Sequence, residues 1–60
     1  MRNEYEKTVL RLLAGRDFIA TEEVAGLIGA SPATARRLIN RLAENRLLRR
    51  VHGGIRPLPP

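Results

Sequence analysis

A four-residue segment near the middle of the chain strongly constrains the secondary structure on either side of it. The segment is Gly29-Ala30-Ser31-Pro32. Glycine takes the left-handed conformation that ends many helices. Serine followed by proline is typical of a helix start, because the serine hydroxyl caps the first turn and proline fits the first helical position. Two helices therefore meet at a turn of about three to four residues, which sets them at a large angle to each other.

Amphipathic patterns on both sides of this turn support the two helices. The first extends from residue 22 to residue 28, with Thr21 as its expected N-cap. The second extends from about residue 32 to residue 44 and ends at Asn45, which we expect in the left-handed conformation. The side chains expected in the core are Val24, Leu27 and Ile28 of the first helix and Ala35, Leu38, Ile39 and Leu42 of the second.

A third helical pattern lies at the start of the chain. It extends from about Glu4 to Ala14 and ends at Gly15. Its apolar positions recur at offsets of three and four residues, which predicts one buried stripe along the helix. The residues of that stripe are Tyr5, Val9, Leu12 and Leu13.

The segment after the last helix predicts a β-hairpin. Residues 47–52 read as one strand, Gly53-Gly54 supplies two residues that accept positive φ, and Ile55-Arg56 begins a return strand. Phe18-Ile19 is too short for an independent strand, and we expect it to join the hairpin as a third, minor strand. A hairpin attached to the second helix of a helix-turn-helix motif is a wing. The expected fold is therefore mainly α with a small β-hairpin, a winged helix-turn-helix of three helices plus a wing.

The size of the chain allows one small core. A chain of 60 residues buries only about 60% of the surface that it exposes when unfolded, so residues 1–56 are expected to form a single domain. Residues 57–60, Pro-Leu-Pro-Pro, predict a proline-rich tail or the start of a linker. The sequence contains no cysteine, and it has neither a signal-peptide pattern nor an apolar run long enough to span a membrane. We therefore expect a cytoplasmic protein.

Positive charge is concentrated in the second half of the chain. Residues 31–60 contain seven arginines and a single acidic residue, whereas residues 1–30 contain four basic and five acidic side chains. The planar guanidinium group of arginine suits phosphates and guanine edges. This bias indicates a surface for nucleic acid or for an anionic membrane, or simply a basic face that keeps the protein soluble.

The outer face of the helix at residues 32–44 is the first candidate site. Arg37 lies near the centre of that face, where it can pair with guanine, and Asn40 lies one turn further along, where it can read adenine. A solvated helix face with ordinary surface arginines is the alternative. The remaining candidate residues are Ala33 on the same face and Ser31, Thr34, Arg36 and Arg41, which are better placed for phosphates.

The expected wing is the second candidate site. Gly53 and Gly54 allow the backbone to approach a groove or a phosphate closely, and Arg50, His52 and Arg56 surround them with hydrogen-bond donors. A tight hairpin whose basic edges discourage aggregation is the alternative. We expect His52, the only histidine, to pack in the turn or contact phosphate rather than bind a metal.

An enzyme is not expected from this set of residues. Asp17, Ser31 and His52 are the only residues of their kinds, so a catalytic triad is formally available. Ser31 is already explained as a helix cap, and a protein of this size offers no deep pocket that excludes water. No glycine-rich phosphate-binding loop follows a strand. We therefore expect no catalytic residue, no cofactor and no metal.

The residues that form these two sites also resemble a known family. The run from Ser31 to Leu42, followed by the run from Leu47 to Gly54, resembles the N-terminal winged helix-turn-helix of DeoR-type bacterial transcription regulators. In that family a Ser-x-x-Thr-x-Arg-Arg segment opens the recognition helix, and an Arg-Val-His-Gly-Gly wing follows it. The chain departs from the pattern at Leu38, where the family usually has aspartate, and at Arg46, where it usually has glycine. Family members generally carry a C-terminal domain that senses sugar phosphates, so the resemblance implies an excised or stand-alone DNA-binding module.

These observations support one main hypothesis, which is sequence-specific binding of double-stranded DNA by the module of a bacterial transcription regulator, whether repressor or activator. The helix at about 32–44 would enter the major groove, and the wing at about 48–56 would contact the backbone or the minor groove. We expect a homodimer on DNA, formed mainly through the C-terminal domain. The alternative is a winged helix that serves as a protein-interaction module or as the regulatory appendage of a larger enzyme. A membrane partner is not expected, because the apolar side of the basic helix is needed for the core.

Overall fold

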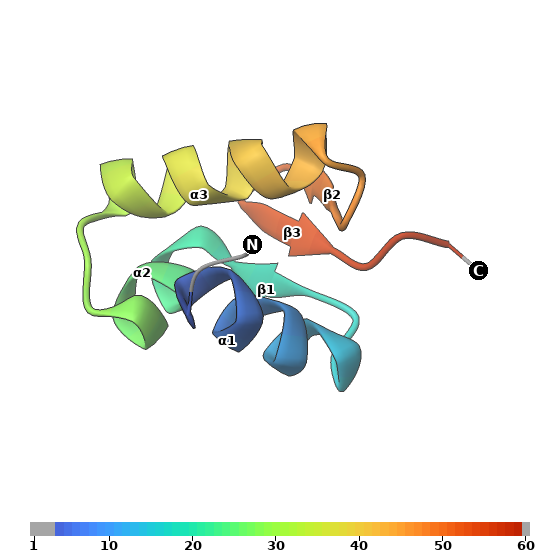
Figure 1. The fold of residues 1–60 in the computed structure, drawn as a ribbon, viewed down its shortest axis with the longest axis horizontal. Helices are drawn as coiled ribbons and strands as arrows, with labels where there is room; N and C mark the ends of the chain where they lie inside the picture. Colours follow the sequence, from blue (N-terminus) through green and yellow to red (C-terminus); the bar gives the residue numbers. More distant parts are fainter. Residues whose placement is uncertain (1–3, 60) are drawn as a thin grey trace.

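The computed structural model describes residues 4–59 and contains three helices and one small sheet (Figure 1). The predicted winged helix-turn-helix is confirmed. The three helices and three strands follow one another along the chain as α1 (Glu4–Ala14), β1 (Ile19–Ala20), α2 (Thr21–Ile28), α3 (Pro32–Glu44), β2 (Arg49–Val51) and β3 (Gly54–Arg56).

Helix α1 has the predicted bounds, but its buried stripe is rotated. Glu6, Val9 and Leu13 are the buried residues of this helix, whereas Tyr5 is 53% exposed. The prediction that Tyr5 is buried was therefore wrong. The stripe still follows offsets of three and four residues, but it begins at a carboxylate that finds an arginine partner on α3.

Helix α2 begins one residue earlier than predicted. Ala20 occupies the N-cap position and makes no side-chain cap, so the prediction that Thr21 is the cap was wrong. The backbone N–H of Thr21 instead donates to the carbonyl of Gly53 in the hairpin, at 3.1 Å. Leu27 was also predicted to be buried but is 41% exposed, and Ala25 takes its place on the inner face. The helix ends at Gly29 with φ +68°, as expected.

Helix α3 confirms the strongest local prediction. The Ser31 Oγ accepts a hydrogen bond from the Thr34 backbone N–H at 3.3 Å, and proline follows in the first turn. The buried side chains are the four that were predicted, Ala35, Leu38, Ile39 and Leu42.

The end of α3 differs from the prediction. Asn45 has φ −84°, and the left-handed residue is Arg46, with φ +58°. The Arg46 N–H donates to the Ala43 carbonyl and the Leu47 N–H donates to the Leu42 carbonyl. These two bonds form a Schellman motif, which requires the left-handed conformation at the residue after the cap.

The sheet has the strand order β1-β3-β2 with antiparallel pairing. The third, minor strand is confirmed, although it comprises Ile19 and Ala20 rather than Phe18 and Ile19. The strand predicted at residues 47–52 is limited to Arg49–Val51. Of the two glycines in the turn, only Gly53 has positive φ, at +79°; Gly54 was also expected to accept positive φ but does not adopt it.

Close packing, rather than positive φ, explains why glycine occupies position 54. It pairs with Ala20 and Val51 on its two sides in the sheet. A Cβ atom at this position would meet the backbone carbonyl of Ile19 and would lie 2.7 Å from the Phe18 ring. The absent side chain therefore lets β1 and the Phe18 ring approach the hairpin.

Within residues 4–59, no helix is long and apolar enough to cross a membrane.

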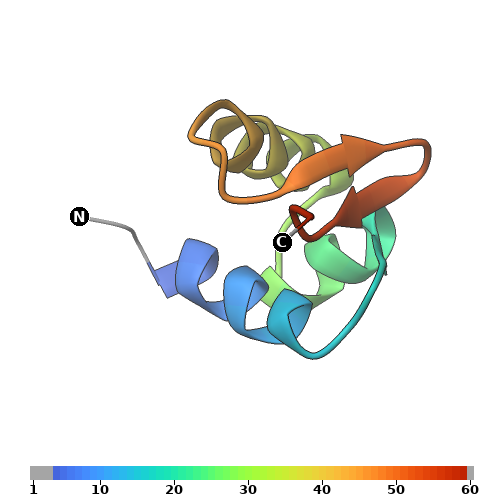
Figure 2. The same ribbon diagram turned by 90° about the vertical axis from the view of Figure 1, so that its right-hand side faces the viewer.

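An aliphatic core joins the helices and the sheet. Figure 2 shows the hairpin extending beside α3 and over the start of α2. The buried core comprises Val9, Leu13, Ile19, Val24, Ala25, Ile28, Ala35, Leu38, Ile39, Leu42, Leu48 and Ile55.

Candidate nucleic-acid interface

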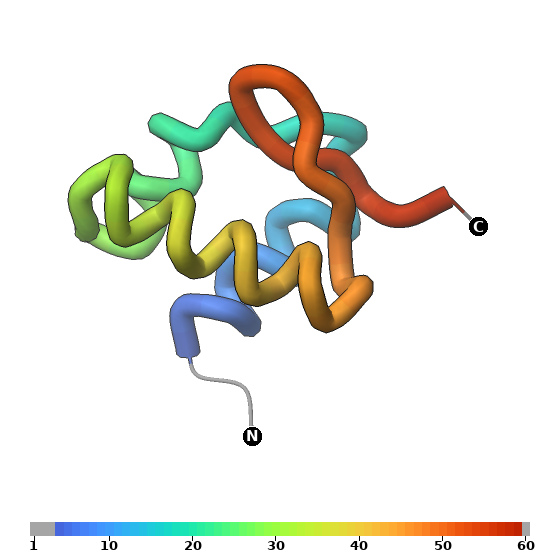
Figure 3. Tube along the Cα trace, turned by 90° about the horizontal axis from the view of Figure 1, so that it is seen from above, coloured from blue at the N-terminus to red at the C-terminus, as the bar shows by residue number. Residues whose placement is uncertain are grey.

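The exposed side chains on the outer face of α3 are polar or small. The two edges of this face lie beside different parts of the molecule. Viewed from above α3 (Figure 3), the hairpin loop lies on one side, beside the start of α2, and the start of α1 lies on the other. Arg37 and Asn40 belong to the outer face between these flanks. The predicted site residues in and just before α3 are all exposed: Ser31, Ala33, Thr34, Arg36, Arg37, Asn40 and Arg41.

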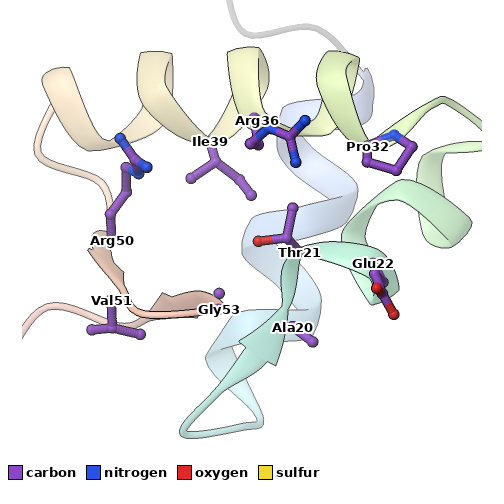
Figure 4. A pocket seen from close by; sticks show the side chains of 10 residues that line it. Ala20, Thr21, Glu22, Pro32, Arg36, Ile39, Arg50, Val51 and Gly53 are labelled. Atoms are coloured by element: carbon purple, nitrogen blue, oxygen red, sulfur yellow. The ribbon is translucent and has the colours of Figure 1, made fainter.

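A cleft of about 510 Å³ separates α3 from the hairpin. Arg36 reaches into it from α3 and Arg50 reaches into it from β2, so two predicted site residues come together across the cleft (Figure 4). The apolar floor includes Ile39. The cleft is lined by Ala20, Thr21, Glu22, Pro32, Arg36, Ile39, Arg50, Val51, Gly53 and Gly54.

The start of α2 contributes residues that the sequence analysis did not assign to the site. The Thr21 hydroxyl points into the cleft between the two arginines, and Glu22 lies at the far end from Arg50 (Figure 4). Thr21 was interpreted only as a helix cap. Its place as the first residue of the first helix in the helix-turn-helix pair is the signal in the sequence that could have identified it.

The hairpin does not present all of its predicted site residues to the same side. Arg50 is the cross-strand partner of Ile55, whereas Arg49 is paired with Arg56. Because side chains alternate along a strand, the Arg49–Arg56 pair lies on the opposite face of the sheet from Arg50. Arg56 and Arg49 line a separate hollow with Asp17 and residues 57–59.

The turn of the hairpin is open to solvent. His52 and Gly53 are exposed there, whereas Gly54 is buried. The structure therefore brings Arg36, Arg50, Gly53 and the buried Gly54 to one cleft and leaves Arg56 outside it.

Arg41 lies on the other flank of α3 and has a partner in α1. Its Nη1 atom is 3.5 Å from the Glu6 Oε2 atom. The Glu6 side chain is only 7% exposed, and the Arg41 side chain is 61% exposed. Glu6 was not predicted from the sequence, although its spacing of three and seven residues from Val9 and Leu13 places it on the buried stripe.

The other ion pairs among residues 4–59 lie in the first half of the chain. In α1, the Lys7 Nζ atom is 3.9 Å from the Glu4 Oε1 atom, and Arg16 forms an ion pair with Glu23 of α2. The hydrogen bond that Arg16 donates to the Glu23 carboxylate raises the pKa of the guanidinium. Within residues 4–59, the arginines of α3 and the hairpin have no acidic partner except at Arg41, so their charge faces solvent.

Metal-ligating side chains do not gather in the part of the chain that the structure describes. No group of three or more histidine, cysteine, aspartate or glutamate side chains is arranged to hold an ion among residues 4–59. The Ser31 hydroxyl is engaged at the start of α3, since it also donates to the Thr34 Oγ1 atom at 3.2 Å.

Known proteins match this chain over most of its length. Residues 6–58 match the family model of the DeoR-like helix-turn-helix domain. The HTH-type transcriptional regulators UlaR of Shigella flexneri and of Escherichia coli are each 46% identical to the chain over 46 residues, which is 77% of this chain. The chain spans only 18% of the length of these relatives. No solved structure gives a significant match. The chain belongs to the DeoR-like helix-turn-helix family, as a DNA-binding domain of the kind that these transcriptional regulators carry.

Proposed function

We propose that this domain binds double-stranded DNA sequence-specifically, as the DNA-binding module of a bacterial transcription regulator. Helix α3 enters the major groove, and the hairpin contacts the adjacent backbone or minor groove. The observation that carries this proposal is the convergence of Arg36 and Arg50 on one cleft beside the polar outer face of α3; neither arginine has an acidic partner within residues 4–59.

The side chains divide between base edges and phosphates according to their place on α3. Arg37 and Asn40 project from the outer face, so we assign them to guanine and adenine edges. Arg36, Arg50 and the Thr21 hydroxyl surround the cleft, so we assign them to one backbone phosphate that lies across its mouth. Phosphate contacts of this kind set the register of α3 on the duplex, because they hold the backbone on one side of the groove.

The start of α3 and the hairpin turn contribute further contacts. Ser31 and Thr34 lie at the first turn of α3, where free backbone N–H groups and the helix dipole favour an anion. Ala33 leaves room for close approach to bases. His52 and Gly53 lie at the exposed turn, where they approach the backbone or the minor groove. The remaining proposed contacts are those of Arg41 and Arg56 with flanking phosphates and of the Gly54 backbone with the groove.

One domain of this size recognises half of an operator. A single module buries roughly 600–1,000 Å² on DNA, so strong binding requires two modules on a near-palindromic or repeated site. We propose that the regulator acts as a homodimer in the cytoplasm, with most of the dimer contacts in a C-terminal domain. We assign it no catalytic function.

The distribution of exposed apolar side chains does not favour the rival function of a protein-interaction module. Such a module needs a hydrophobic patch on the outer face of α3. The large apolar side chains that are exposed within residues 4–59 all lie outside α3, namely Tyr5, Phe18, Leu27 and Leu58.

Selection of bound sequences from a random duplex pool tests the proposal and also reveals the spacing of half-sites. The binding constant for the selected duplex should fall steeply as the salt concentration rises. On a log–log plot of binding constant against salt concentration, the slope should be about −0.9 for each phosphate that the domain neutralises. Arg36→Ala should weaken binding to all sequences and reduce the slope. Arg37→Ala should relax the preference at one base position, by about 1–3 kcal/mol.

Arg11→Ala is the matched control, because Arg11 is an exposed arginine near the end of α1 and lies outside the proposed interface. It should leave the binding of the selected duplex close to that of the original chain. Recovery of no enriched sequence, or binding that does not change with salt, would contradict the proposal.

A further inference from the structure

The ion pair between Glu6 and Arg41 connects α1 to α3, the proposed recognition helix. Glu6 lies on the buried stripe of α1 beside Val9, and its carboxylate reaches the Arg41 guanidinium at 3.5 Å. Helix α3 packs mainly against α2 and also against β2, so this pair is a separate, charged link from α1. Arg41 follows Arg37 by one helical turn, which places the linked guanidinium at the edge of the outer face.

The burial of Glu6 makes this link more restrictive than an ordinary surface pair. A buried carboxylate is stable only when charged or hydrogen-bonded groups compensate for its lost hydration. The Glu6 side chain is only 7% exposed, so its carboxylate has little access to solvent, whereas the Arg41 side chain is 61% exposed. The guanidinium has five N–H donors in a planar fork, and contact with one carboxylate leaves several of them directed outward.

We propose that Glu6 is a positioning residue for DNA recognition, which fixes Arg41 so that its outward N–H groups meet a backbone phosphate in only one register of α3. This role rests on the DNA-binding function proposed above. A phosphate contact carries no sequence information by itself, but a fixed one holds the base-reading side chains in register. A freed Arg41 contacts phosphates in any register, so it favours non-specific binding as much as specific binding.

Glu6→Gln separates this role from a structural one. Because the variant keeps the Arg41 charge and removes its anchor, non-specific affinity should rise by about two- to fivefold, the size of one exposed charge interaction. Selectivity for the selected duplex over random duplex should fall by a similar factor. The salt dependence of non-specific binding should become steeper by about 0.9 units of slope, as expected for one additional phosphate contact.

Two further variants provide the controls. Glu4→Gln removes the same charge from an exposed position of the same helix, and it should leave selectivity unchanged. In an Arg41→Gln background, Glu6→Gln should change neither selectivity nor slope, because the residue through which Glu6 acts is absent. If Glu6→Gln does not fold, Arg41→Lys takes its place, since it keeps the charge and loses the planar fork; reduced selectivity is again expected.

The state of the pair can also be followed without DNA. The Arg41 Nη–H signals in nuclear magnetic resonance spectra of the free domain at low temperature should exchange slowly in the original chain, because an Nη atom contacts Glu6, and they should exchange faster in Glu6→Gln.

Three results would overturn the role of Glu6: unchanged selectivity in Glu6→Gln, including an equal loss of specific and non-specific affinity; an effect that persists in the Arg41→Gln background; or a Glu4→Gln variant that behaves in the same way. Absence of any DNA binding by the original chain would overturn the proposed function as well.

Discussion

Replacement of Arg46 by glycine should make the domain more stable. Arg46 has φ +58° at the end of α3, where the Schellman hydrogen bonds of residues 46 and 47 require the left-handed conformation. A side chain with a Cβ atom in that conformation costs about 1–2 kcal/mol. Glycine avoids this cost but loses about 0.5–1 kcal/mol more conformational entropy on folding. The difference predicts a net gain of about 0.5–1 kcal/mol for Arg46→Gly.

Thermal unfolding followed by circular dichroism measures this gain. In a domain of this length, the gain corresponds to an increase of about 4–8 °C in Tm. Arg46→Ala is the matched control, because it removes the same exposed side chain and charge but keeps the Cβ atom. The alanine variant should unfold close to the original chain. An equal increase in both variants would assign the effect to the lost charge, and no increase in the glycine variant would refute the conformational argument.

Three other substitutions test the packing that holds the interface in place. Gly54→Ala should destabilise the domain by about 1–3 kcal/mol in urea unfolding, because the new Cβ atom meets the Ile19 carbonyl and the Phe18 ring. Ser31→Ala should cost about 1 kcal/mol and increase hydrogen exchange at the Thr34 amide, which the Ser31 hydroxyl caps. Leu42→Ala should cost about 2–5 kcal/mol, enough to unfold much of the sample at ambient temperature, and loss of the helical signal in circular dichroism measures it.

Local signals account for the parts of the fold that could be predicted. Gly29 and the Ser31 cap act within a few residues of their own position, so the turn between α2 and α3 follows from the sequence there. The period of the apolar residues in α3 is also local, and its four buried positions were all correct. The arginine-rich outer face follows from the same periodicity, because the residues that are not buried must lie outside.

Signals that depend on a distant partner were interpreted less well. Gly54 was predicted to serve the hairpin turn, but its lack of a side chain serves contact with Phe18 and Ile19, more than 30 residues earlier in the chain. The error at the end of α3 was a local one: the left-handed conformation was assigned to Asn45 on residue preference, whereas the hydrogen bonds between residues 42 and 47 require it at Arg46. The usual glycine of the family at this position was the signal in the sequence that pointed to Arg46.

The sequence by itself determined the helix-turn-helix, the hairpin and the concentration of arginine on one half of the chain, because caps, turns and periodicity act over short distances. Tertiary structure alone decided where these arginines lie relative to one another and to the rest of the molecule. It brought Arg36 and Arg50 to one cleft, moved Arg56 to the other face of the sheet and joined Arg41 to Glu6. The physical reason is that periodicity fixes the spacing of a buried stripe but not its rotation, which depends on the side chains that the packed neighbours present.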